Sequence, residues 1–243
     1  ADLVANEQRW LPELAPRLPL PVPVPLRVGL PSGDYPWNWT VVAWYDGEVA
    51  ADVALIDPIV DAQRLGRFVR ALHAPAPADA PINAFLRGRP VRELRQRVAD
   101  SLERLGDSID AVAVATRFDR LADVDDWQGV PVWLHGDLHS ANLLARDGAI
   151  CAVIDFGDVT SGDPAVDLAI GWMLFDDDAL GVFRASAGTV DDATWSRAQA
   201  WARARGAARA APSPRAAPRR WATTARPARL PGSRCTRSAP WRP

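Results

Sequence analysis

The sequence predicts an α+β protein in which short strands alternate with amphipathic helices. Three observations indicate this class. Residues 39–45 (WTVVAWY) are β-branched and aromatic and precede Asp46-Gly47, which is typical of a strand and its exit turn. Apolar side chains recur at helical spacing in residues 61–73 and 91–105. Residues 143–156 read as two strands joined at Asp147-Gly148, a strong β-hairpin signal.

The remaining elements follow from local patterns. Residues 2–14 place Leu and Trp among charges, which predicts a short amphipathic helix. Residues 16–25 (PRLPLPVPVP) predict an extended connector, because each proline fixes φ and lacks a backbone donor. A short buried strand is expected at residues 131–134 (PVWL), and a helix at residues 164–174, with Asp163 as its N-cap.

The charge is unevenly distributed along the 243 residues. All 28 basic residues are arginine, and the chain contains no lysine. Residues 202–243 hold 11 arginines and no carboxylate, so residues 1–201 carry 17 arginines against 30 carboxylates, a net charge of −13. Leu230 is the only large aliphatic residue of residues 202–243, so we expect this tail to be disordered. Its enrichment in Arg, Ala, Pro and Ser is typical of a GC-rich gene read out of frame, so our hypothesis for this tail is a frameshift.

Several classes of protein are disfavoured by the composition. Cys151 and Cys235 are far apart and have no ligand partners at metal spacing, which disfavours a disulfide framework or zinc site. No stretch reaches the ~18 consecutive apolar residues of a membrane helix, and the first residues do not read as a secretion signal. We therefore expect a cytoplasmic protein without a membrane partner.

The informative stretch is HGDLHSAN at residues 135–142, followed by IDFG at residues 154–157. It fits H-x-D-L-x-x-x-N and then D-F-G, a pattern of enzymes that transfer phosphoryl groups. Such chemistry needs a carboxylate to orient the attacking hydroxyl and accept its proton, a role that suits Asp137. It also needs hard oxygen ligands for Mg²⁺, which Asn142 and Asp155 can supply. The alternative is that Asp137 and Asn142 cap a turn while Asp155 begins one.

These motifs resemble those of the aminoglycoside phosphotransferase family, whose members have a protein-kinase-like fold of two lobes. HGDLHSANLL, IDFGD and GDPAVDLA carry the resemblance, with YPWNW and WYDGE as weaker matches, and it covers about residues 1–201. The resemblance implies ATP and Mg²⁺ as cofactors, Asp137 as catalytic base, and Asn142 and Asp155 as metal and cofactor ligands. It also implies that Asp167 supports the catalytic loop and that His135 is structural.

Three upstream residues acquire roles from the same resemblance. Backbone groups near Trp44 and Tyr45 would hydrogen-bond adenine in the hinge between lobes; the alternative is an aromatic core strand. Glu7 resembles the glutamate that pairs with the basic residue contacting the α- and β-phosphates. The alternative for Glu7 is a solvated surface charge.

The chain also departs from the family pattern. A glycine-rich loop and a strand with the phosphate-pairing basic residue should precede Glu7, yet only six residues do. We therefore expect an N-terminally truncated chain with three parts. Residues 1–46 would be an incomplete small N-lobe with the hinge, residues 47–201 a mainly helical C-lobe with the catalytic and metal loops, and residues 202–243 an atypical tail.

The leading functional hypothesis is ATP-dependent transfer of the γ-phosphate to a hydroxyl of a small molecule, such as an aminoglycoside or macrolide antibiotic. The acidic body favours a cationic acceptor, which Asp176, Asp177 and Asp178 could contact if this run does not simply face water. One alternative is a catalytically inactive remnant of such a kinase. Another is nucleic-acid binding through the Arg-rich tail, with Trp221 and Trp241 for stacking, which the acidic body disfavours.

Overall fold

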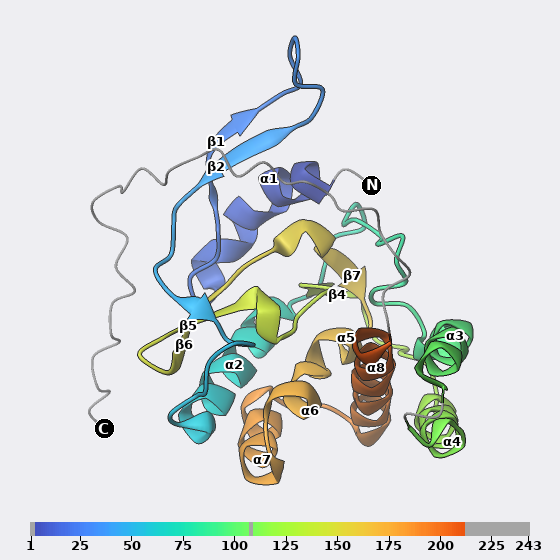
Figure 1. The fold of residues 1–243 in the computed structure, drawn as a ribbon. Helices are drawn as coiled ribbons and strands as arrows, with labels where there is room; N and C mark the ends of the chain where they lie inside the picture. The colour runs from blue at the N-terminus through green and yellow to red at the C-terminus, as the bar shows by residue number, and fades with distance from the viewer. Residues whose placement is uncertain (1–2, 107–108, 212–243) are drawn as a thin grey trace.

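The computed structural model describes residues 3–106 and 109–211 and has an α+β architecture (Figure 1). At one end, a hairpin of β1 (Pro25–Gly29) and β2 (Trp39–Val42) stands over helix α1 (Leu3–Leu14). The opposite end is mainly helical, as predicted. Its helices are α2 (Pro58–Leu72), α3 (Arg95–Leu105), α4 (Ala111–Ala122), α5 (Ala165–Leu168), α6 (Ile170–Leu174), α7 (Asp177–Ser186) and α8 (Asp192–Ala210).

Two small antiparallel sheets lie between these ends. In the first, β3 (Glu48–Val49) pairs with β5 (Leu143–Arg146), which pairs with β6 (Ala149–Val153). In the second, β4 (Val132–Leu134) pairs with β7 (Thr160–Gly162). The predicted turn joins β5 to β6, where Asp147 and Gly148 have φ values of 52° and 70°, as a tight hairpin turn requires. Residues 135–142 therefore connect the two sheets, and residues 154–159 connect them a second time.

The helix predicted at residues 61–73 is present as α2 and extends further toward the N-terminus. Asp57 caps it by accepting a hydrogen bond from Val60 N, and Pro58 occupies the first turn. Its apolar stripe is fully buried and packs against α7. All four side chains that the periodicity selected are buried: Leu65, Phe68, Val69 and Leu72.

Three predicted elements differ in extent. The strand expected at residues 39–45 ends at Val42, whose pairing partner is Pro25; proline has no N–H to continue the ladder. The helix expected at residues 91–105 begins with a 3-10 turn, η2 (Val91–Leu94), before α3. The helix expected at residues 164–174 is split into α5 and α6, since Trp172 N bonds to Ala169 O, a tighter i to i+3 step.

The expected disorder from residue 202 onward is wrong for residues 202–210, which form the second half of α8 (Figure 1). Alanine and arginine are strong helix formers, and this segment contains no proline. It buries Ala204, Arg205 and Ala207 rather than large aliphatic side chains. The rest of the tail, with Trp221, Leu230, Cys235 and Trp241, lies outside the described residues, and so do the disorder and frameshift predictions made for it.

A search of the described helices for a segment long and apolar enough to cross a membrane finds none.

Candidate active site

The loop after β4 is held by a buried carboxylate from α5. Asp167 is fully buried and accepts hydrogen bonds from the backbone N–H of His135 (2.7 Å) and of Gly136 (3.0 Å). Its pKa is lowered: burial acts to raise it, but the hydrogen bond and charge of His73 and the contacts with His135 outweigh burial. An ionised carboxylate thus fixes the start of the loop, the arrangement that a supporting role for Asp167 requires.

His135 links the two motif loops from inside the core. Its Nδ1 accepts the N–H of Asp137 at 3.2 Å, so Nε2 carries the proton and donates to Ile154 O at 3.0 Å. The ring also packs against Phe156, with 4.5 Å between the ring centroids. Burial lowers the pKa of His135, which favours a neutral imidazole. These contacts fit the structural role expected for His135.

Asp137 is surrounded by basic groups. Its carboxylate lies 2.9 Å from Nη2 of Arg87, 3.4 Å from Nη2 of Arg205 and 3.6 Å from Nε2 of His139. Burial acts to raise the pKa of Asp137, but the hydrogen bond from His139 and the charges of Arg205 and Arg87 hold it well below its usual range. The side chain is 27% exposed, so this ionised carboxylate remains open to a ligand.

Asn142 and Asp155 lie in adjacent loops. Nδ2 of Asn142 donates to the carbonyl of Asp137 at 3.0 Å, which orients its amide oxygen away from that carbonyl. The backbone of Asn142 accepts the N–H of Ile154 at 2.9 Å and so connects the two motifs directly. Asp155 is exposed, adopts a left-handed conformation (φ 63°) and precedes the 3-10 turn η5 (Phe156–Asp158). Asp155 thus begins a turn, as the alternative interpretation expects, but its carboxylate makes no cap hydrogen bond to that turn.

Glu7 reaches this site from the other end of the molecule. Helix α1 packs on η5, and burial together with the charge of Asp155 raises the pKa of Glu7 to about 7, although the N–H of Phe156 lowers it. Glu7 is thus a half-buried carboxylate beside the Asp155 loop rather than a solvated surface charge. Six of the predicted residues are therefore brought together, from four separate segments: Glu7, His135, Asp137, Asn142, Asp155 and Asp167.

Trp44 and Tyr45 lie in the segment between β2 and β3. The Tyr45 hydroxyl donates to the carbonyl of Val22 at 2.8 Å, and the Trp44 side chain is 71% exposed. These positions place the pair on the connection between the hairpin end and the helical end (Figure 1).

The donor set of the site suits a divalent cation bound together with nucleotide phosphates. Asn142 and Asp155 offer an amide and a carboxylate oxygen, and the Glu7 carboxyl group lies close enough to feel the charge of Asp155. No group of three or more His, Cys, Asp or Glu side chains forms a metal cluster within the described residues. Mg²⁺ in nucleotide sites needs only one or two protein carboxylates, because phosphates and waters complete its shell. The residues therefore fit the ion.

Sequence reasoning missed three residues around Asp137. Arg87 lies in an irregular segment without a recognisable motif, and Arg205 belongs to the tail that was expected to be disordered. His139 stands inside the motif but at one of its unspecified positions. Arg205 could have been noticed as part of a helix, since the Ala- and Arg-rich composition favours one.

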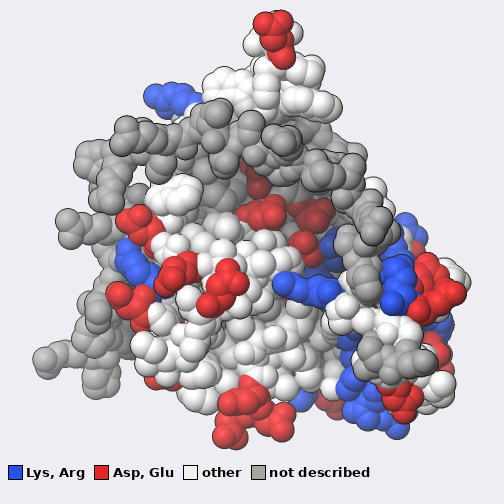
Figure 2. Space-filling view, viewed as in Figure 1, with Lys and Arg blue, Asp and Glu red and all other residues white. Residues whose placement is uncertain are grey.

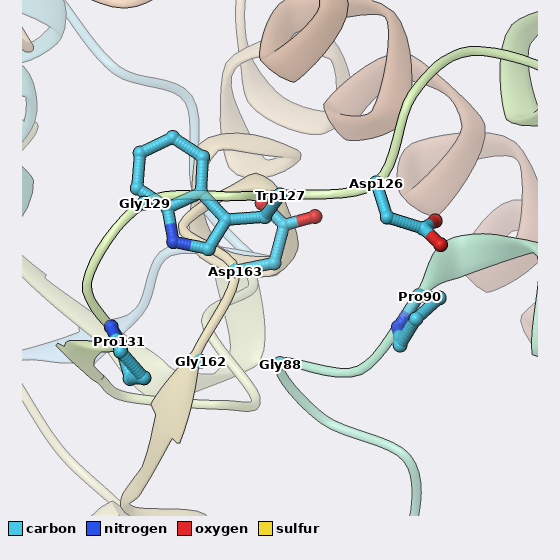
Figure 3. A pocket seen from close by; sticks show the side chains of 8 residues that line it. All are labelled: Gly88, Pro90, Asp126, Trp127, Gly129, Pro131, Gly162 and Asp163. Atoms are coloured by element: carbon cyan, nitrogen blue, oxygen red, sulfur yellow. The ribbon is translucent and has the colours of Figure 1, made fainter.

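A cavity of about 210 Å³ lies behind the Arg87 segment (Figure 3). None of the eight predicted site residues lines it, although Gly88, the neighbour of Arg87, does. In Figure 2 some acidic side chains lie in a hollow between the hairpin end and the helical end, and others are spread over the rest of this face. The cavity is therefore separate from the candidate site at Asp137. Its lining residues are Gly88, Pro90, Asp126, Trp127, Gly129, Pro131, Gly162 and Asp163.

The fold is that of a kinase-like phosphotransferase. So is the arrangement of Asp137, whose loop is joined to the Asp155 loop through Asn142. Comparison with family models supports this class: the model described as "Phosphotransferase enzyme family" (APH) matches residues 1–227. The chain therefore belongs to the APH phosphotransferase enzyme family and is a phosphotransferase. No curated protein matches it in sequence.

Solved structures with the same fold include enzymes of both antibiotic classes. A mutant aminoglycoside 2'-phosphotransferase IIIa in complex with GDP is 21% identical, with a TM-score of 0.64 over 85% of this chain and 72% of that one. Macrolide 2'-phosphotransferase from Brachybacterium faecium is 24% identical, with a TM-score of 0.52 over 88% and 80%. An aminoglycoside phosphotransferase from Streptomyces rimosus, in complex with ADP and streptomycin, is 19% identical, with a TM-score of 0.53 over 86% and 84%. At these identities the likeness shows the fold alone.

Proposed function

We propose that this phosphotransferase moves the γ-phosphoryl group of ATP to a hydroxyl of a small molecule, with Asp137 as the catalytic base. The observation that carries the proposal is the geometry of Asp137: an ionised, partly exposed carboxylate on a loop fixed by Asp167 and joined by Asn142 to the Asp155 loop. Phosphoryl transfer requires this placement of a proton acceptor beside a phosphate-binding site.

Asp137 acts mainly by orientation. A carboxylate with a low pKa is a weak base, so it holds the acceptor hydroxyl by accepting its hydrogen bond. The hydroxyl oxygen forms the new bond to γ-phosphorus while the bond from phosphorus to the ADP oxygen breaks. The hydroxyl proton moves to Asp137 late, when the oxygen has become acidic. This order suits the loose transition state of such reactions.

Asn142 and Asp155 are the residues that would hold Mg²⁺, which when bound neutralises charge on the nucleotide phosphates. Glu7, beside Asp155, is positioned to pair with a basic group at the phosphates. We assign adenine to the hinge segment at Trp44 and Tyr45, whose backbone groups lie in no helix or strand and would hydrogen-bond it. A GTP complex is the alternative for the nucleotide, since three of the structural neighbours hold GDP.

For the acceptor we propose an aminoglycoside or a macrolide. Neighbours of this fold are phosphotransferases of both classes, and one of them is a complex with kanamycin. The excess of 13 carboxylates over arginines in residues 1–201 favours a cationic molecule. The three aspartates that could contact such an acceptor lie at the start of α7. Asp176 caps this helix by accepting the N–H of Ala179, and Asp177 and Asp178 are exposed in its first turn.

The test is Asp137→Asn, which keeps the shape of the side chain but cannot accept the proton. We expect kcat for phosphate transfer to fall about 10²- to 10⁴-fold. The affinity for Mg²⁺-ATP, measured by calorimetry, should stay that of the parent chain, because Asn142 and Asp155 are intact.

Asp147→Asn is the matched control: this exposed carboxylate occupies the β5–β6 turn, where asparagine tolerates the positive φ. Transfer should be measured with ATP and GTP over a panel of aminoglycosides and macrolides. Undiminished turnover by the Asp137→Asn variant would show that Asp137 is not the base. If the parent chain binds nucleotide but transfers phosphate to no acceptor, the inactive alternative replaces the proposal.

A further inference from the structure

Helix α8 inserts an arginine beneath the catalytic loop. Arg205 is only 7% exposed, and its guanidinium donates to two backbone carbonyls, Leu138 O at 2.6 Å through Nη1 and Gly136 O at 2.7 Å through Nη2. These two carbonyls flank Asp137 in the chain. One planar group thus fixes the backbone on both sides of the proposed base.

The rest of the loop backbone is also held by side chains. The carbonyl of Asp137 itself is bonded by Asn142, and the N–H groups of His135 and Gly136 are bonded by Asp167. Residues 135–139 belong to no helix or strand, so these side chains replace the ladder that would otherwise fix the backbone. Arg205 supplies two of the three carbonyl contacts at residues 136–138.

The charged groups around Asp137 and Arg205 come from four segments of the chain. Asp137 faces Arg87 of the segment before α3, His139 of its own loop and Arg205 of α8. Arg205 also lies in the field of Asp158 in η5 and of Asp167 in α5. Burial and the charge of Arg87 lower the pKa of Arg205 to about 10, while the nearby carboxylates raise it, so the guanidinium stays protonated at neutral pH. Its hydrogen bonds to the loop are therefore charge-assisted.

We propose that Arg205 is a positioning residue for phosphate transfer: by bridging Gly136 O and Leu138 O, it aims the Asp137 carboxylate at the acceptor hydroxyl. The inference rests on the proposed function, because it takes Asp137 as the base. A misplacement of about 1 Å in a catalytic group can cost about 100-fold in rate. The planar guanidinium can span two carbonyls in one plane, whereas a lysine ammonium at this depth reaches one of them well.

A second buried arginine on α8 provides a comparison. Arg197 bonds Asp163 at 2.7 Å, Asp125 O at 2.6 Å and Thr194 Oγ1 at 2.8 Å, and all three partners lie outside the Asp137 loop. Arg197 thus connects α8 to the segments before α5 and after α4 without bonding the Asp137 loop. Variants at the two sites therefore separate a loss of stability from a loss of positioning.

The experiment measures kcat, the affinity for Mg²⁺-ATP and the midpoint of thermal unfolding in Arg205→Met and Arg205→Lys. For Arg205→Met we expect kcat to fall about 100-fold while nucleotide affinity is kept. Arg205→Lys should recover part of that loss, because it restores the charge and one carbonyl contact. If Arg205→Met does not fold, the Arg205→Lys variant alone decides through its reduced kcat.

Two variants on the same helix serve as controls. Arg209→Met alters an exposed residue and should match the parent chain in every measurement, and Arg197→Lys should lower the unfolding midpoint without lowering kcat. The inference is overturned if the Arg205 variants keep the parent kcat, or if they lose rate and nucleotide affinity together as the midpoint falls. Asp137→Asn is measured in parallel: full turnover in that variant overturns the proposed function itself, whereas normal kcat in the Arg205 variants alone overturns only this inference.

Discussion

At the scale of single residues, the site depends on buried charges that act through backbone groups. Asp167 lies beneath the loop and bonds the N–H groups of His135 and Gly136, while Arg205 bonds carbonyls of the same loop from another helix. The negative side chain thus fixes N–H groups of the loop, and the positive side chain fixes its carbonyl groups. The Asp137 carboxylate, which both sets orient, is left to accept a ligand.

Asp167→Asn should lower the free energy of unfolding by about 2–3 kcal/mol at pH 7, because charge-assisted bonds to two buried N–H groups are weakened. The folded-state pKa of Asp167 is below its ordinary value of 3.8, so the ionised carboxylate stabilises the fold above that pH. This contribution is lost as the pH falls through the folded-state pKa. Urea unfolding of both proteins between pH 5 and pH 3 should show the difference shrinking toward acid, and a constant difference would contradict the assignment.

Local motifs explain which site residues were predictable. Asp137, Asn142 and Asp155 lie within 19 positions of one another, so the sequence spacing carries their geometry. Arg205 meets Leu138 across 67 positions, and Arg87 reaches Asp137 from an irregular segment. Such contacts exist only once α8 and the segment before α3 have packed, and no local pattern encodes them.

At the scale of elements, one turn signal and the apolar stripes predicted the hairpin and the helices, whereas two N-cap signals were overlooked. The Asp147-Gly148 turn predicted the β5–β6 hairpin, and the stripe of α2 predicted that helix. The sequence analysis assigned no helix to α4 or α7, although both begin at aspartates that accept the expected cap hydrogen bonds: Asp110 from Ala113 N and Asp176 from Ala179 N. The second half of α8 was missed because it buries alanines and an arginine instead of a row of large apolar residues.

Two helical glycines should respond oppositely to alanine. A Cβ at Gly206 of α8 meets nothing within 4 Å, so Gly206→Ala should raise the free energy of unfolding by about 0.5–1 kcal/mol by reducing backbone entropy in the unfolded chain. A Cβ at Gly66 of α2 would lie 2.6 Å from Ser186 Cβ and 2.8 Å from Phe183 O, so Gly66→Ala should destabilise the contact with α7.

Thermal unfolding of these two variants beside the parent chain tests the helical packing around the site. A loss of stability in Gly206→Ala would mean that residues 202–210 are not a helix in solution. Unchanged stability in Gly66→Ala would mean that α2 and α7 pack less closely than the structure shows.

At the scale of the whole molecule, the two ends meet where the chemistry is proposed. Helix α1 packs on η5, which places Glu7 beside Asp155, while α8 at the other end places Arg205 beside Asp137. Basic groups surround the proposed base, whereas carboxylates gather on the proposed nucleotide side. The excess of carboxylates over arginines in residues 1–201 therefore affects a ligand through the long-range field of the protein. The side chains next to Asp137 are basic and have the opposite sign.

This division predicts how salt affects the two acceptor classes. A polycationic aminoglycoside such as kanamycin is attracted by the acidic surface, and screening shortens the reach of that field from ~14 Å at 0.05 M salt to ~4 Å at 0.5 M. Its kcat/KM should therefore fall about 10-fold over that range of NaCl. A macrolide with one amino group should show a much shallower dependence in the same assay. Equal slopes would indicate that the net charge of −13 over residues 1–201 does not contribute to acceptor binding, and a cationic acceptor would then lose its main support.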